Sequence, residues 1–279
     1  MKSKIEKIDL GNLKTIDHTI SINSPFENLE YFHAMEKSDS ASEQTGWIPN
    51  HLGEIEHGKL TSFLPLYKKF NSYGEFVFDH QWAHALQNTG RNYYPKLLTA
   101  VPFTPCEGDR ILGNNKDKKL ALIESGIQKL EEEEIESWHI LFPNDEGKRI
   151  LRHKDFIERF NYRFVWENNN FSSFDDFLSI FTSRQRATLR KERKSITKAN
   201  IKFSCKKFDA ITDEDWNQFY IFYQQTYYER GQSPYLSRDF FSKINAVNQL
   251  VKPIIFFAYS EAEVIAASLC FEGQETLFG

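Results

Sequence analysis

Short apolar runs alternate with helix-start signatures along the chain, and this alternation constrains the fold more than any other feature of the sequence. The segment Ser24-Pro25-Phe26-Glu27 offers a capping serine, a proline in the first turn and a glutamate, and it predicts a helix to about Lys37. The segment Thr182-Ser183-Arg184-Gln185 offers a second capping box and predicts a basic helix to about Ala199. The apolar runs between such starts are as short as typical strands. We therefore expect an α/β protein of the α+β type, with mixed sheets.

The expected elements follow a similar order in the two halves of the chain. Each half has a strand, then helices, then closely spaced strands that suit an antiparallel meander. His57-Gly58 is expected as a hairpin turn between strands 47–56 and 59–67, and Asp79 and Asp117 are expected as helix caps. The other expected strands are 16–22, 96–101, 138–142, 162–166, 201–208, 254–259, 264–271 and 275–278, and the other helices are 79–89, 117–136, 146–156, 213–229 and 238–247, with a short one opening at Ser173.

Length and composition narrow the class of protein. A chain of 279 residues suits one large domain or two ordinary ones, and the recurring order suggests units at 1–158 and 159–279. With 15% aromatic residues, the chain is not of a disordered or collagen-like class. Three widely spaced cysteines predict reduced thiols. The sequence has neither a signal-like start nor a long apolar segment, which predicts a cytoplasmic protein without an integral membrane span.

Charge is distributed unevenly. The net charge of the chain is −4, but the segment 182–207 holds ten basic residues and one acid, so it carries +9 and the remainder carries −13. Such an asymmetry is typical of one cationic surface for an anionic partner on an otherwise acidic protein.

The basic helix predicted at 182–199 is the strongest physical indication of a binding site. Arg186, Arg190 and Arg193 recur at helical spacing and form one cationic face, while Leu189 and Ile196 are expected to face the core. A guanidinium group bonds two phosphate oxygens at once, which suits a nucleotide, a tRNA backbone or a lipid pyrophosphate. We therefore assign Arg184 with these three arginines to phosphate binding. A merely solvated helix face explains the same pattern equally well.

Several peptides together resemble one bacterial family. They are FHAMEKSDSASEQTGWIPNHL (32–52), LPLYKKFNSYGEFVFDHQWAHA (64–85), YYPKLLTAVPFTPCEGDRIL (93–112), FVWENNNFSSFDDFLSIFTSRQRATLRKERKSI (164–196) and YLSRDFF (235–241). They resemble the FemAB-like "peptidoglycan biosynthesis/recognition" family, which is placed in the acetyltransferase (GNAT) superfamily. The resemblance implies two tandem GNAT-like halves. It also implies that the second half is incomplete, because members of the family continue beyond the strand that matches 275–279.

The resemblance suggests a function. Fem transferases move an aminoacyl group from aminoacyl-tRNA to an amine of a peptidoglycan precursor, and GNAT enzymes use acetyl-CoA. We therefore expect an acyl- or aminoacyltransferase that takes either of these donors as a substrate, has no permanently bound cofactor and acts on an amine acceptor. The alternatives are a noncatalytic protein that binds RNA or an anionic envelope precursor, and an inactive fragment.

Candidate catalytic residues lie in the first half. Glu75 is the candidate general base for the acceptor amine, the alternative being a solvated surface carboxylate. Lys96 and Arg110 flank aromatic, proline-rich loops and are assigned to the anionic substrate, with plain surface solvation as the alternative. His80 and His84 lack a third ligand, so no metal site is predicted.

Overall fold

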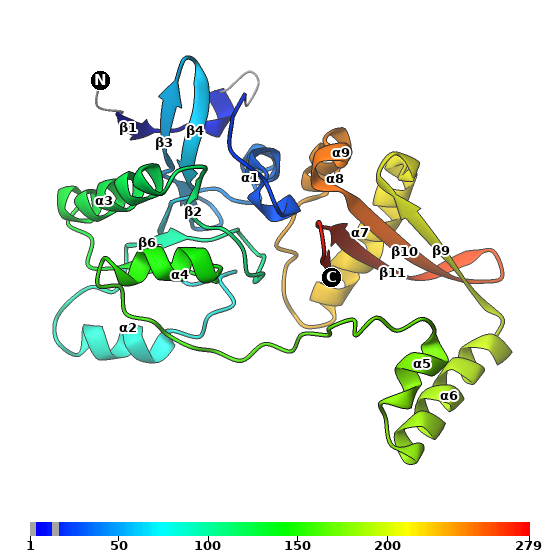
Figure 1. Cartoon of the computed structure of the whole chain (residues 1–279). Coiled ribbons are helices and arrows are strands. Elements are labelled where there is room, and N and C mark those ends of the chain that lie inside the picture. The colour runs from blue at the N-terminus through cyan, green and yellow to red at the C-terminus, as the bar shows by residue number, and fades with distance from the viewer. Residues whose placement is uncertain (1–3, 13–16) are drawn as a thin grey trace.

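The fold is described by a computed structural model that covers residues 4–12 and 17–279 (Figure 1). It confirms the mixed α/β class. Its first part contains β1 (Ile5–Lys7), α1 (Leu29–Lys37), β2 (Trp47–Pro49), β3 (Leu52–Glu56), β4 (Lys59–Leu64), β5 (Tyr67–Lys69), α2 (His80–Gln87), β6 (Lys96–Thr99), β7 (Leu112–Gly113), α3 (Lys116–Glu132), β8 (Trp138–Ile140) and α4 (Asp145–Arg152). Its second part contains α5 (Phe174–Ser179), α6 (Ser183–Lys198), β9 (Ile201–Lys207), α7 (Asp213–Tyr228), α8 (Arg238–Ala246), α9 (Asn248–Val251), β10 (Pro253–Ser260), β11 (Glu263–Glu272) and β12 (Leu277–Phe278).

The first part holds two four-stranded sheets. Their strand orders are β1-β3-β4-β7 and β2-β5-β6-β8, and every pairing is antiparallel except that of β6 with β8. The predicted hairpin turn is confirmed, because His57 and Gly58 join β3 to β4 with φ of +52° and +79°. Two positive φ values suit the twist of a tight antiparallel hairpin. Helix α3 covers these sheets by burying Leu122 and Ile123 in a core with Leu97 and Trp138.

Local capping differs in detail from the prediction at the first helix and at α3. Ser24 caps a short 3-10 turn, Pro25–Glu27, and Asn28 then caps α1. Asn115, and not Asp117, caps α3. The predicted strand at 16–22 is wrong over the part that the structure describes, where His18 forms an isolated bridge with Leu60; residue 16 lies outside the described residues.

The second part holds an antiparallel sheet with the order β12-β11-β10-β9. The predicted meander is confirmed for β10, β11 and β12. The pairing of β9 with β10 adds a fourth strand that the sequence did not assign to the meander. Helix α7 lies over one face of the sheet (Figure 1), where Ile255 and Phe257 are buried. Phe203 and Phe256 on the opposite face are exposed. One face of the sheet is therefore packed in the core and the other faces solvent.

A single aromatic core joins the two parts. The centroid of the Phe26 ring lies 5.2 Å from that of Phe271 and 5.1 Å from that of Phe278. Tyr31 on α1 packs edge-on against Phe240 on α8. Because these rings are largely buried, residues of the first part complete the hydrophobic core of the second.

The connection between the parts differs most from the prediction. The predicted strand 162–166 is wrong: residues 156–171 as described form neither helix nor strand, and they lead to α5 and α6, which project from the body (Figure 1). The basic helix begins and ends as predicted, with a capping box of Thr182 and Gln185. Its expected packing is wrong, because every residue of α6 is at least partly exposed, including Leu189 and Ile196.

Candidate functional site

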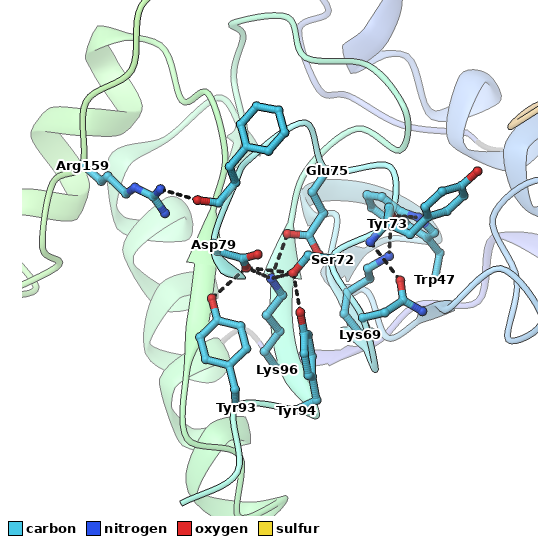
Figure 2. Close-up of polar contacts among 12 residues, drawn as sticks. Trp47, Lys69, Ser72, Tyr73, Glu75, Asp79, Tyr93, Tyr94, Lys96 and Arg159 are labelled. Carbon is cyan, nitrogen blue, oxygen red and sulfur yellow. Dashed lines mark hydrogen bonds and ion pairs between the residues drawn. The ribbon is translucent and has the colours of Figure 1, made fainter. Parts of the chain in front are cut away.

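A buried cluster of charged and hydroxyl groups surrounds Lys96 at the start of β6 (Figure 2). The Lys96 ammonium donates to Glu75 at 2.8 Å, to Asp79 at 2.6 Å and to the Ser72 hydroxyl at 2.8 Å. The side chains of Lys96, Glu75 and Asp79 are each 0% exposed. The structure therefore brings together two residues that the sequence singled out, Glu75 and Lys96.

Two tyrosines complete the cluster. The Tyr93 hydroxyl donates to Asp79 at 2.7 Å, and the Tyr94 hydroxyl lies 2.7 Å from that of Ser72. Both rings lie within 5.6 Å of the Lys96 ammonium, where their π-electrons stabilise its charge. Within the part of the chain that is described, Glu75 Oε1 and Asp79 Oδ1 are buried without a hydrogen-bond partner. Burial of an oxygen without a hydrogen-bond partner lowers the stability of the protein. Such atoms are therefore rare and often have a role in binding or catalysis.

The two carboxylates have different proton affinities. Burial raises the pKa of Glu75, and the attraction of Lys96 and Lys69 offsets this in part. Burial would also raise the pKa of Asp79, but hydrogen bonds from Lys96, Tyr93 and Ser72 outweigh it and lower the pKa to about 2. Glu75 is therefore the carboxylate of the pair that accepts a proton more readily.

A second buried lysine lies next to this cluster. The Lys69 ammonium lies 3.8 Å from the centroid of a Trp47 ring and donates to the Tyr73 carbonyl at 3.1 Å. Burial lowers the pKa of Lys69 to about 7, although Glu75 opposes the effect. The Lys69 side chain therefore takes up or releases a proton near neutral pH.

The loop 70–79 covers the cluster and bears exposed aromatic rings. Gly74 has φ of +77°, and a Cβ there would lie 2.4 Å from the ring of Phe103, so this position requires glycine. Phe76 has φ of +56°, an unfavourable conformation for a bulky residue and one found preferentially at functional sites. The ring of Tyr235 packs on Phe76, and it stacks on Phe103 at 4.9 Å. Residues of both parts of the chain therefore meet beside Glu75.

The four arginines of α6 lie apart from this cluster, on the projecting helix (Figure 1). Three of them have partners nearby. Arg186 donates to the Phe181 carbonyl, Arg190 pairs with Asp175 at 3.1 Å, and Arg193 lies over the ring of Phe174. The Arg190 and Asp175 side chains are more than half exposed, so their pairing is weak.

Arg110 has a structural position. It is 1% exposed, and its guanidinium donates to the carbonyls of Leu141, Asp109 and Cys106. Burial lowers its pKa to about 10, and Glu27 opposes this most strongly. In this arrangement Arg110 ties loop backbones together inside the protein.

Sequence reasoning missed most of the partners of Lys96. Asp79 stands at the predicted N-cap position of α2, but its side chain makes no capping hydrogen bond and accepts one from Lys96 instead. The alternative for Glu75, a solvated surface carboxylate, is wrong, because Glu75 is buried.

Tyr93 and Tyr94 belong to the aromatic loop that the sequence places beside Lys96, but their contacts with Asp79 and Ser72 were not predicted. Ser72 had no motif in the sequence. The sequence does place polar and charged residues beside strand β6 and in loop 70–79. This grouping was the available indication of the cluster.

Among residues 4–12 and 17–279, no group of three or more His, Cys, Asp and Glu side chains is arranged to hold a metal ion. The same residues contain no helix of the length and apolarity needed to cross a bilayer.

Comparison with known proteins identifies the family. A search of curated proteins gives no match. The family model described as FemAB-like, peptidoglycan biosynthesis/recognition, matches residues 4–279, which is nearly the whole chain. The chain therefore belongs to the FemAB-like family of peptidoglycan biosynthesis and recognition proteins.

Proposed function

We propose that the protein transfers an acyl or aminoacyl group from a phosphate-bearing donor to an amine in peptidoglycan metabolism. One observation carries the proposal beyond the family: α6 is a sixteen-residue helix, all of it at least partly exposed, in a segment that carries +9. Because α6 buries so little apolar surface, it contributes little to the stability of the core. Its exposed positive charge is therefore the property that a binding partner would recognise.

The donor is an aminoacyl-tRNA or acetyl-CoA, both of which carry phosphates. In the proposal, Arg184, Arg186, Arg190 and Arg193 bind these phosphates, and the exposed pair of Arg190 with Asp175 opens when they do. Both donors are cytoplasmic, and we place the protein there. The four-stranded antiparallel sheet β9 to β12, which follows a basic helix, supports the assignment of the second part to a GNAT-like unit.

Glu75 is the proposed general base. An amine attacks an ester or thioester only after it has lost its proton, and a carboxylate with a raised pKa is suited to accept that proton. The amine nitrogen forms the new bond to the acyl carbon while the bond to the tRNA oxygen or the CoA sulfur breaks, without a covalent enzyme intermediate. The leaving oxygen or sulfur takes the bonding electron pair and the second proton that the amine gives up. Since Glu75 is buried, the proposal requires loop 70–79 to move when the acceptor binds.

The burial of Glu75 and Lys96 favours a second candidate function, a noncatalytic protein that binds RNA or an anionic envelope precursor through α6. In that case the buried cluster would have a purely structural role. Binding through α6 is common to both functions, whereas transfer of the acyl group distinguishes them.

The experiment is a binding titration followed by a transfer assay. Arg184→Gln/Arg190→Gln is expected to weaken binding of aminoacyl-tRNA or acetyl-CoA by about tenfold or more. Arg152→Gln is the matched control, because Arg152 is an exposed arginine paired with Glu158 outside α6. Equal affinity of all three proteins for both donors would remove α6 from the proposal.

A further inference from the structure

An unusually exposed apolar segment connects the two parts of the chain. We call it the apolar strip; its side chains are between 61% and 102% exposed, and they are Ile157, Phe160, Tyr162, Phe164, Val165 and Trp166. The described residues 156–171 form neither helix nor strand, so the strip presents its side chains from extended chain. A connection of this length without secondary structure is uncommon in compact proteins and is often a binding segment.

Both ends of the strip are tied to neighbouring elements. Arg159 donates to the Phe78 carbonyl at 2.8 Å and lies 5.9 Å from the ring of Trp82 on α2. Phe78 and Trp82 are themselves 78% and 60% exposed, so they extend the apolar surface. At the other end, Trp166 packs on Phe177 of α5. The segment runs between α2 and α5 along one side of the molecule (Figure 1).

Positive charge lies beyond one end of the strip. Residues 152–181 hold four basic and five acidic side chains, a net −1, whereas residues 182–207 carry +9. The strip leads through α5 to α6: Trp166 packs on Phe177 of α5, and Arg193 of α6 lies over the ring of Phe174 at the start of α5. The apolar surface therefore adjoins a cationic helix, and a partner that covers both must combine negative charge with an apolar interior.

We propose that the apolar strip binds the surface of an anionic lipid bilayer. Aromatic side chains, Trp and Tyr above all, are favoured at the boundary between headgroups and acyl chains, and basic residues are attracted to anionic headgroups. The aliphatic residues Ile157 and Val165 favour a bilayer over a nucleic acid, because aliphatic side chains do not stack on bases. The strip lies on the membrane and leaves α6 beside the headgroups. The proposal does not depend on acyl transfer.

Cosedimentation of the full chain with vesicles tests the proposal. We expect binding to vesicles of phosphatidylcholine mixed with phosphatidylglycerol, and much weaker binding to phosphatidylcholine alone. The triple variant Phe160→Ser/Tyr162→Ser/Phe164→Ser is expected to lower the partition coefficient by about tenfold or more, because each ring loses its burial in the interface. Since these rings are exposed, the variant is expected to keep its circular dichroism spectrum.

A second triple variant is the matched control. Phe203→Ser/Ile221→Ser/Leu250→Ser removes three exposed apolar side chains from β9, α7 and α9, and it is expected to bind vesicles like the wild type. Lys191→Gln/Lys194→Gln is expected to weaken binding to anionic vesicles by about fivefold per charge, with no effect on uncharged ones.

Three outcomes would overturn the proposal. The first is equal partitioning of wild type and strip variant. The second is a dimer in sedimentation velocity that the strip variant abolishes, which would make the strip an interface between copies of this chain. The third is binding to single-stranded RNA that the strip variant loses while vesicle binding is absent.

Discussion

The ammonium of Lys96 lies between two buried carboxylates. Its loss leaves Asp79 without its cation and Glu75 with only the attraction of Lys69. Lys96→Met is expected to lower the free energy of unfolding by ~3–5 kcal/mol, the usual cost of breaking a buried pair. Lys68→Met is the matched control. Lys68 lies on the adjoining strand β5 and pairs with Glu133 at 2.8 Å, but its side chain is 28% exposed. Its loss should lower the free energy of unfolding by ~1 kcal/mol or less. Urea unfolding of both variants measures the difference; equal losses would contradict the account of the cluster.

Asp79 makes the stability of the protein depend on pH. Its pKa is about 2 in the folded protein, against 3.8 ordinarily, so its carboxylate stabilises the fold above about pH 4 and this contribution is lost as the pH falls toward 2. We expect the wild type to lose on the order of 2 kcal/mol more than Asp79→Asn between pH 4 and pH 2. Unfolding curves measured across that range test this. Parallel pH profiles for the two proteins would show that Asp79 has an ordinary pKa.

At the same scale, the sequence predicted two members of the cluster but not the cluster. The sequence predicts Glu75 as a base and Lys96 as an anion ligand, and both roles stay predictions. Their ion pair joins a loop to a strand that follows it after a helix, and no local pattern specifies such a contact. Arg110 is a second example. Its burial lets its guanidinium bond to backbone carbonyls, and the local sequence does not specify that burial.

Among the helices, α6 and α7 begin with the same capping box but differ in what they bury. Thr182 and Gln185 cap α6, which is exposed throughout, whereas Thr212 and Asp215 cap α7, which buries Trp216. Thr212→Ala is therefore expected to lower the global free energy of unfolding by ~1–2 kcal/mol. Thr182→Ala should change it by less than ~0.5 kcal/mol and instead speed amide exchange in the first turn of α6. Denaturant unfolding combined with hydrogen exchange tests the pair, and equal global losses would mean that α6 folds with the core.

The accuracy of the sequence prediction also varied from element to element. The bounds of α6 and the three-stranded meander of β10, β11 and β12 were predicted well, because caps and turns are encoded in a few neighbouring residues. The predicted strand 162–166 failed for a different reason. Its apolar residues resemble a half-buried strand, but a strand also needs a partner edge, and local sequence carries no information about one.

In the whole molecule, the aromatic core couples the two parts of the chain. No periodicity in the sequence predicts this contact between them. Phe240→Ala removes a buried ring of α8 that packs on Tyr31 of α1, and it should lower the free energy of unfolding by ~3–5 kcal/mol. It should also speed amide exchange in both α1 and α7. Leu122→Ala, in the separate core under α3, is the control and should leave exchange in α7 unchanged until global unfolding. Faster exchange confined to the second part would mean that the parts fold independently.

The central claim is that this FemAB-like chain transfers an acyl group to an amine. The most direct measurement incubates the purified protein with a peptidoglycan precursor that bears a free amine and with donor labelled in the acyl group, either aminoacyl-tRNA or acetyl-CoA. The account predicts label in an amide of the acceptor, with transfer reduced at least ~100-fold in Glu75→Gln, provided that this variant unfolds cooperatively like the wild type. It further predicts weaker donor binding, with little change at saturation, in Arg184→Gln/Arg190→Gln. Label that stays on both donors, or transfer that Glu75→Gln leaves unchanged, would contradict the account.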